Sequence, residues 1–138
     1  MSAVEKATWD QFVSEHLLQT GIFSGLALVA VNGNIVYSYG CLNSLDKEEV
    51  SQFLAVFGCS QERATILKLN LGQENLVKTT FRIYHQNHIS MYATSAGNQK
   101  GITLSRLPQG IFITVFGKPA LPHQAICAVE KFSERLRF

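Results

Sequence analysis

The second half of the chain constrains the fold most, because its apolar residues recur at every second position from about residue 64 onward. Short, turn-forming stretches (LGQ, HQNH, SAGNQK and PQ) separate the apolar segments. Connections this short join antiparallel neighbours. This half therefore predicts an antiparallel run of five strands, which are ATILKLNL, ENLVKTTFRIY, ISMYAT, GITLSRL and GIFITVF.

The first half begins with a predicted amphipathic helix and continues into a hairpin. Thr8 and Gln11 have the spacing of a capping box, and Gly21 is expected to end the helix. Residues 24–31 and 35–39 are rich in Val, Ile, Tyr and Leu, and the NGN between them supplies the positive φ angles of a tight turn. We therefore expect a helix followed by two antiparallel strands.

Two further helices are predicted. KEEVSQFLAVF (47–57) has acids in its first turn, and Ser44 or Asp46 can cap it. Pro122 suits the first turn of a helix over residues 122–138. Its apolar face consists of Ala125, Ala128, Val129, Phe132 and Leu136.

The order of these elements predicts one α+β domain over residues 1–138. We expect an antiparallel sheet of about seven strands, with the N- and C-terminal helices packed side by side on one face. A short helix is expected after the first hairpin.

Composition predicts a soluble cytoplasmic domain. The 138 residues are 46% hydrophobic, which suits one core, and no apolar run is long enough for a membrane span. The N-terminus shows no secretory signal, and a net charge of +2 without a basic tract disfavours nucleic acid as a partner. Cys41, Cys59 and Cys127 lack CxxC spacing and are interpreted as small buried residues carrying reduced thiols.

No catalytic constellation or cofactor motif is recognised. The histidines of HQNH (85–88) have no further ligands nearby, so no metal site is predicted. Cys127 near His123 is the nearest candidate for a nucleophile and its base, but one pair on one helix predicts no enzyme. The remaining glycines form no phosphate-binding pattern, so we interpret them as turn residues, namely Gly97, Gly101, Gly110 and Gly117.

Aromatic residues indicate a recognition surface. Trp9 and Phe12 lie one helical turn apart, and Tyr37 and Tyr39 share a face of the second strand. If the two chain ends lie side by side, these rings converge near Phe138. Composition alone favours the alternative, in which Trp9 and Phe12 are core residues.

The order of motifs resembles the profilin family along almost the whole chain. TWDQFVSEHLLQTG is similar to the family's first helix, and KEEVSQFLAVF stands where the family has its short second helix. MYATSAGNQKGITLSR resembles the strand, glycine-rich turn and strand near the family's actin face. AVEKFSERL is similar to the C-terminal helix.

This resemblance implies a site for proline-rich ligands, whose stiff polyproline II backbone stacks on flat aromatic rings. Phe12 lacks a hydroxyl, and Arg135 stands where the family has an aromatic residue, so altered proline recognition is expected. The corresponding residues are Trp9, Phe12, Tyr37, Arg135, Leu136 and Phe138.

The resemblance also implies a face for monomeric actin. Thr94 and Ser95 stand where actin-binding profilins carry basic residues. The available contacts are Lys100, Lys118, Gln124 and Lys131. The small basic cluster of Lys131, Arg135 and Arg137 implies weak phosphoinositide binding.

The function implied is that of a mostly monomeric, cytoskeleton-associated adaptor without enzymatic activity. It binds monomeric actin and proline-rich proteins such as formin-type elongation factors, and so regulates filament assembly. Two other classes share a small antiparallel sheet with helices. One is a roadblock- or longin-like scaffold subunit for GTPase or trafficking complexes, and the other is a PAS-like sensor or enzyme with an enclosed pocket.

Overall fold

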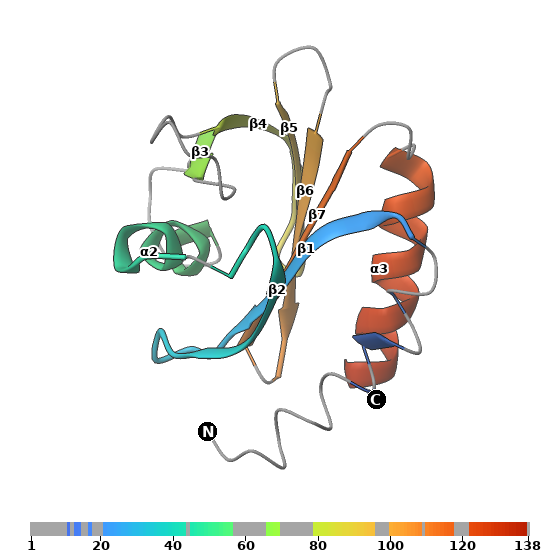
Figure 1. Cartoon of the computed structure of the whole chain (residues 1–138), viewed down its shortest axis with the longest axis horizontal. Coiled ribbons are helices and arrows are strands. Elements are labelled where there is room, and N and C mark those ends of the chain that lie inside the picture. Colours follow the sequence, from blue (N-terminus) through green and yellow to red (C-terminus); the bar gives the residue numbers. More distant parts are fainter. Residues whose placement is uncertain are drawn as a thin grey trace.

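A computed structural model of the chain describes a curled antiparallel sheet with a helix on each face (Figure 1). The described residues are 11, 13–14, 17, 21–43, 45–56, 66–69, 79–95, 100–108, 110–117 and 122–137. Gln11, Val13 and Ser14 have helical backbone.

The sheet has seven strands in the order β2-β1-β7-β6-β5-β4-β3, and every neighbouring pair is antiparallel. The expected α+β architecture is therefore confirmed. The strands are β1 (Phe23–Val29), β2 (Ile35–Gly40), β3 (Ile66–Leu69), β4 (Thr79–Gln86), β5 (Ser90–Ser95), β6 (Lys100–Leu107) and β7 (Gly110–Gly117).

The first hairpin forms at the predicted turn. Gly33 has a φ of 92°, the Ala30 amide donates to Asn34 O at 2.8 Å, and the Gly33 amide donates to Ala30 O at 2.9 Å. Next to this turn, the pairing of β1 with β2 contains a register shift between Leu28 and Val29. The NGN signal thus defines the connection between these two strands.

Alternating side chains divide the core between the two faces of the sheet. One cluster lies under α2 (Lys47–Val56) and includes Phe53, Phe81, Met91 and Ile113. The other lies under α3 (Pro122–Arg137). It includes Val13, Leu17, Phe23, Leu26, Leu28, Tyr37, Phe112, Phe116, Val129 and Phe132. The N-terminal helical residues therefore share a face with α3.

The predicted cap of α2 is Asp46. Asp46 Oδ1 accepts from the Glu49 amide at 2.8 Å, and Glu49 Oε1 accepts from the Asp46 amide at 3.3 Å. This reciprocal pair satisfies donors at the start of the helix, as a capping box does. Val50 and Phe53 are buried on the inner side of α2, and Phe57 lies outside the described residues.

One residue of α2 also closes an edge of the sheet. The Gln52 side chain accepts from the Lys68 amide and donates to Lys68 O, each at 2.9 Å. Lys68 belongs to β3, which is the last strand of the sheet. The side-chain amide therefore supplies this edge strand with the two hydrogen bonds that another strand would provide.

Two expectations about turns are wrong. Gly101 lies inside β6 rather than in a turn, where it pairs with Phe116 of β7, and a Cβ there would overlap the Phe116 ring. HQNH does not form the whole turn either, because β4 continues through Gln86 and the His85 ring stacks on Tyr92. The turn instead uses Asn87, whose Oδ1 accepts from the Ile89 and Ser90 amides.

Candidate ligand-binding groove

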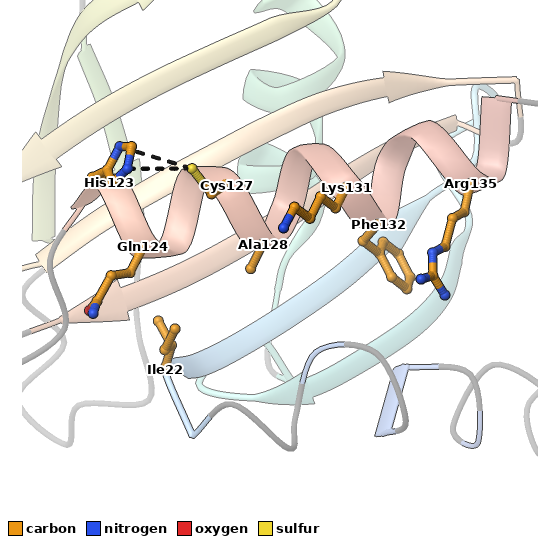
Figure 2. Close-up of a pocket in the computed structure, with 8 residues that line it drawn as sticks. All are labelled: Ile22, His123, Gln124, Cys127, Ala128, Lys131, Phe132 and Arg135. Atoms are coloured by element: carbon orange, nitrogen blue, oxygen red, sulfur yellow. Dashed lines mark hydrogen bonds between the residues drawn. The ribbon is translucent and has the colours of Figure 1, made fainter.

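A groove of about 540 Å³ runs along α3 (Figure 2). Its apolar lining consists of Ile22, Ala128 and Phe132. Ile22 directly precedes β1 and faces the middle of the helix. The remaining lining residues are polar or charged: His123, Gln124, Cys127, Lys131 and Arg135. The groove therefore combines apolar contact with cations along one side of the helix.

Two basic residues of α3 lie together on the groove side of the helix. Residues four positions apart lie on the same side, so Lys131 and Arg135 form one pair and Glu130 and Glu134 another. Lys131 and Arg135 line the groove. Glu130 instead faces β5, where its Oε1 accepts from the Tyr92 hydroxyl at 2.6 Å and the Ser90 hydroxyl at 3.0 Å. The cations thus face the groove, while Glu130 faces the sheet.

Packing of Phe132 fixes this orientation. Its ring is 2% exposed and stacks on Phe112 of β7, with ring centroids 4.9 Å apart. Ala125 and Val129 are fully buried on the same side of α3. Because these residues hold the helix on the sheet, Lys131 and Arg135 keep their places beside the groove.

The residues predicted for the proline-rich site are only partly described. Arg135 is exposed and lines the groove. Tyr37 is 3% exposed and belongs to the cluster under α3, so little of its ring is available to a ligand. Trp9, Phe12 and Phe138 lie outside the described residues, as does the side chain of Leu136.

The residues predicted for actin are not brought to one surface. Gln124 and Lys131 line the same groove as Arg135. By the alternation of β6, Lys100 lies on the other face of the sheet, with Ile102 and Leu104 of the α2 cluster. Lys118 lies outside the described residues.

Cys127 is exposed, contrary to the expectation of burial, because it lies on the outer side of α3. Its Sγ lies 3.7 Å from His123 Nε2 and 3.9 Å from Nδ1, one helical turn away. The predicted Cys127–His123 pair is therefore a contact, but it lies at an open surface. Cys41 is half-buried, and Cys59 lies outside the described residues.

We expect alkylating reagents to modify Cys127 well before Cys41. Burial raises the pKa of the Cys41 thiol, so at neutral pH less of the reactive thiolate forms and the reagent reaches it less easily. Peptide mass mapping after timed exposure to iodoacetamide measures both rates in one sample. Equal modification rates would contradict the exposure of Cys127 and the partial burial of Cys41.

A cluster on β4 and β5 was not foreseen from the sequence. The His85 ring stacks on Tyr92 with centroids 4.9 Å apart, and Tyr84 lies 6.4 Å from the same ring with 53% of its surface exposed. A register shift between Ile83 and His85 accompanies this arrangement. The only available signal was the density of aromatic residues at the ends of two predicted strands, which does not reveal their pairing.

The Tyr92 phenol makes stability depend on pH in alkaline solution. Burial, followed by the hydrogen bond to Glu130, raises the pKa of Tyr92 from 10.0 to about 12. Between these values the folded state holds a proton that the unfolded chain has lost, so stability falls as pH rises through this window.

Urea unfolding of the wild type should show this loss between pH 10 and about 12, and Tyr92→Phe should reduce it. Tyr39→Phe on the exposed edge strand is the matched control. An unchanged pH profile in Tyr92→Phe would show that another group carries the effect.

The described residues contain no group of three or more His, Cys, Asp or Glu side chains placed to hold a metal ion. Over the same residues, no helix has the length and apolar character needed to span a bilayer.

Comparison with solved structures shows a shared fold. LokiProfilin1 in complex with rabbit actin is 14% identical, with a TM-score of 0.73, over 99% of this chain and 96% of the other. The LokiProfilin2 complex with rabbit actin is 13% identical, with a TM-score of 0.72, over 99% and 97%. Profilin IA of Acanthamoeba castellanii is 19% identical, with a TM-score of 0.74, over 93% and 95%.

Comparison at the level of sequence families is more specific. No curated protein sequence matches the chain significantly. The Profilin family model matches residues 7–138, which include every described strand and helix. With its sheet order, α3 and the helical residues near the N-terminus, the chain belongs to the profilin family.

Proposed function

We propose that this protein binds monomeric actin and proline-rich segments of actin assembly factors, and so regulates filament assembly without catalysing a reaction. The observation that carries the proposal is the Profilin match over residues 7–138. The fold shared with LokiProfilin1 and LokiProfilin2, both solved with rabbit actin, supports the actin half. We propose a cytoplasmic, cytoskeleton-associated and mostly monomeric protein.

The groove along α3 supports the proline-rich half of the proposal. Ile22 and Ala128 offer apolar contact for proline rings, and Gln124 and Arg135 offer donors for the carbonyls of a polyproline II ligand. Trp9, Phe12, Leu136 and Phe138 are proposed to extend this surface, with formin-type elongation factors as partners. Weak phosphoinositide binding is proposed for Lys131, Arg135 and Arg137.

A titration with a polyproline peptide tests the proline-rich half. Trp9 is the only tryptophan of the chain, so its fluorescence should change as the peptide binds beside it. Calorimetry in parallel measures binding without depending on where Trp9 lies. If neither Trp9 fluorescence nor calorimetry detects binding at millimolar peptide, the proline-rich half of the proposal is refuted.

Monomeric actin tests the other half, and point variants locate the contact face. We expect the wild type to be retained by immobilised monomeric actin and to slow spontaneous polymerisation. Lys131 and Lys100 lie on opposite faces of the sheet, so Lys131→Glu and Lys100→Glu should not weaken retention equally. Lys47→Glu, on the exposed surface of α2, controls for the change in net charge. A wild type that is not retained at low salt would refute the actin half.

A further inference from the structure

The NGN turn between β1 and β2 contains a reactive pair of groups that the proposed function does not use. Asn32 is exposed and is directly followed by Gly33. Because glycine has no Cβ, its main-chain nitrogen can approach a neighbouring side chain closely. Among the described residues, and leaving out its chain neighbours, the heavy atom closest to a Cβ built at Gly33 is Leu54 Cδ1, 4.0 Å away. The Asn32 amide and the Gly33 nitrogen are therefore an accessible electrophile and nucleophile.

The Asn32 side chain already lies over the Gly33 peptide. Its Oδ1 accepts from the Asn34 main-chain amide at 3.0 Å, so the side chain folds forward across residue 33. When a nucleophile adds to Asn32 Cγ, negative charge develops on this oxygen, and a hydrogen-bond donor aimed at it stabilises the addition. The contact with Asn34 therefore both orients Asn32 Cγ and polarises its carbonyl group.

One hydrogen bond opposes an attack by Gly33. Its amide donates to Ala30 O at 2.9 Å, and this bond must open before the nitrogen can add to Asn32 Cγ. A main-chain hydrogen bond contributes only modestly to stability, so its opening slows the reaction by about tenfold at most. The folded turn therefore lowers the rate relative to an unstructured chain without abolishing the reaction.

We propose that Asn32 is a site of intramolecular deamidation. Gly33 N gives up its proton to a base in the solvent and adds to Asn32 Cγ, the Cγ–Nδ2 bond breaks, and ammonia leaves. The product is a cyclic imide of residues 32 and 33. Water opens this imide at either of its two carbonyls, which leaves aspartate or isoaspartate at position 32. The isoaspartyl carboxylate is then a substrate for enzymes that methylate carboxyl groups of this kind.

The modification changes the hairpin as well as its charge. Isoaspartate adds one methylene to the main chain inside the turn, which is closed by the hydrogen bond of 2.8 Å from the Ala30 amide to Asn34 O. Because β2 is the last strand at its end of the sheet, it is held there by pairing with β1 alone. A lengthened turn disturbs the register of that pair. Deamidation therefore loosens β2 in the molecules that carry it.

Incubation of the folded full chain in warm, mildly alkaline buffer tests the proposal. Peptide mass mapping follows conversion of each asparagine, and a protein isoaspartyl methyltransferase with labelled methyl donor quantifies isoaspartate. We expect at least about tenfold more conversion at Asn32 than at Asn34 or Asn43, because the residue after each of these carries a side chain.

Two variants assign the label to one position. Asn32→Gln keeps a side-chain amide but requires a larger ring to close, so it should remove the label. Asn34→Gln is the matched control, because it keeps the Asn32–Gly33 pair and the main-chain donor, and it should retain the label. Circular dichroism confirms that both variants are folded.

Three results would overturn the proposal. The first is equal conversion at Asn32, Asn34 and Asn43, or none at Asn32. The second is conversion at Asn32 only in chain unfolded by urea, because the folded turn would then be protective. The third is a label that persists in Asn32→Gln, which would assign it to another residue. None of these measurements depends on binding of actin or of proline-rich ligands, so the inference stands or fails separately from the proposed function.

Discussion

Replacing Phe112 with alanine lowers the free energy of unfolding by about 3–5 kcal/mol, as expected for a large-to-small change at a filled position. The Phe112 ring is completely buried and stacks on Phe132, at an angle of 29° between the rings. Its removal leaves a cavity between β7 and α3. Urea denaturation followed by circular dichroism measures the loss.

Ser133→Ala is the matched control at the same interface. The Ser133 hydroxyl is buried and has no hydrogen-bond partner among the described residues. Its removal should leave the free energy of unfolding unchanged or raise it slightly, because the folded wild type bears the desolvation cost of a buried hydroxyl without a hydrogen bond. If Phe112→Ala costs less than about 1 kcal/mol, the aromatic stack does not hold α3 on the sheet.

The consequence of Phe112→Ala for binding separates stability from function. Because the buried Phe132 ring holds α3, which carries most of the groove residues, a loosened stack should also weaken proline-rich binding in the fraction that stays folded. A double-mutant cycle with Phe132→Ala measures the coupling between the rings directly.

The second large effect is expected at Gly110, where alanine should lower the free energy of unfolding by about 2–4 kcal/mol. Gly110 has a φ of +146°, a backbone conformation that residues with a Cβ rarely adopt. A Cβ would overlap the carbonyl oxygen of Val29 and lie 2.9 Å from the Cα of Ala30. Both obstacles are backbone atoms at the end of β1, so no side-chain rotation relieves them.

Gly21→Ala separates backbone conformation from steric overlap. Gly21 also has a positive φ, of +68°, but among the described residues no heavy atom lies within 4 Å of the position its Cβ would take. This variant should therefore lose only about 1 kcal/mol, the cost of the left-handed conformation. Thermal or urea unfolding measures both variants. If Gly110→Ala and Gly21→Ala lose the same free energy of unfolding, β1 and β7 can move apart at Gly110 with little loss of stability.

Much of the fold is predictable from the sequence, because local signals define it. NGN gives the first hairpin, and Asp46 with Glu49 gives the start of α2. The apolar alternation of the later strands survives in the structure, with Ile111 and Ile113 under α2 and Phe112 under α3. These patterns need only a few neighbouring residues to be recognised.

The unpredicted features depend on residues far apart in the chain. The Tyr92 hydroxyl donates to Glu130, which lies 38 positions later in the chain. At position 101 a Cβ would overlap the ring of Phe116 on the neighbouring strand, so a glycine is required there. The spacing of Gln124, Lys131 and Arg135 puts them on one side of a helix, but which side of α3 faces the groove is set by the residues that pack on the sheet. The sequence assigned these three residues to two different ligands.

The pairing of Gln52 with Lys68 limits how this sheet can grow. Fibre-like addition of one sheet to the next requires two receptive edges on each molecule, one to accept a strand and one to offer the next. Since Gln52 occupies both main-chain groups of Lys68, an incoming strand at β3 must first displace a side chain anchored on α2. Even if another molecule paired with β2, further growth through β3 would have to displace Gln52, so this pairing disfavours extension of the sheet.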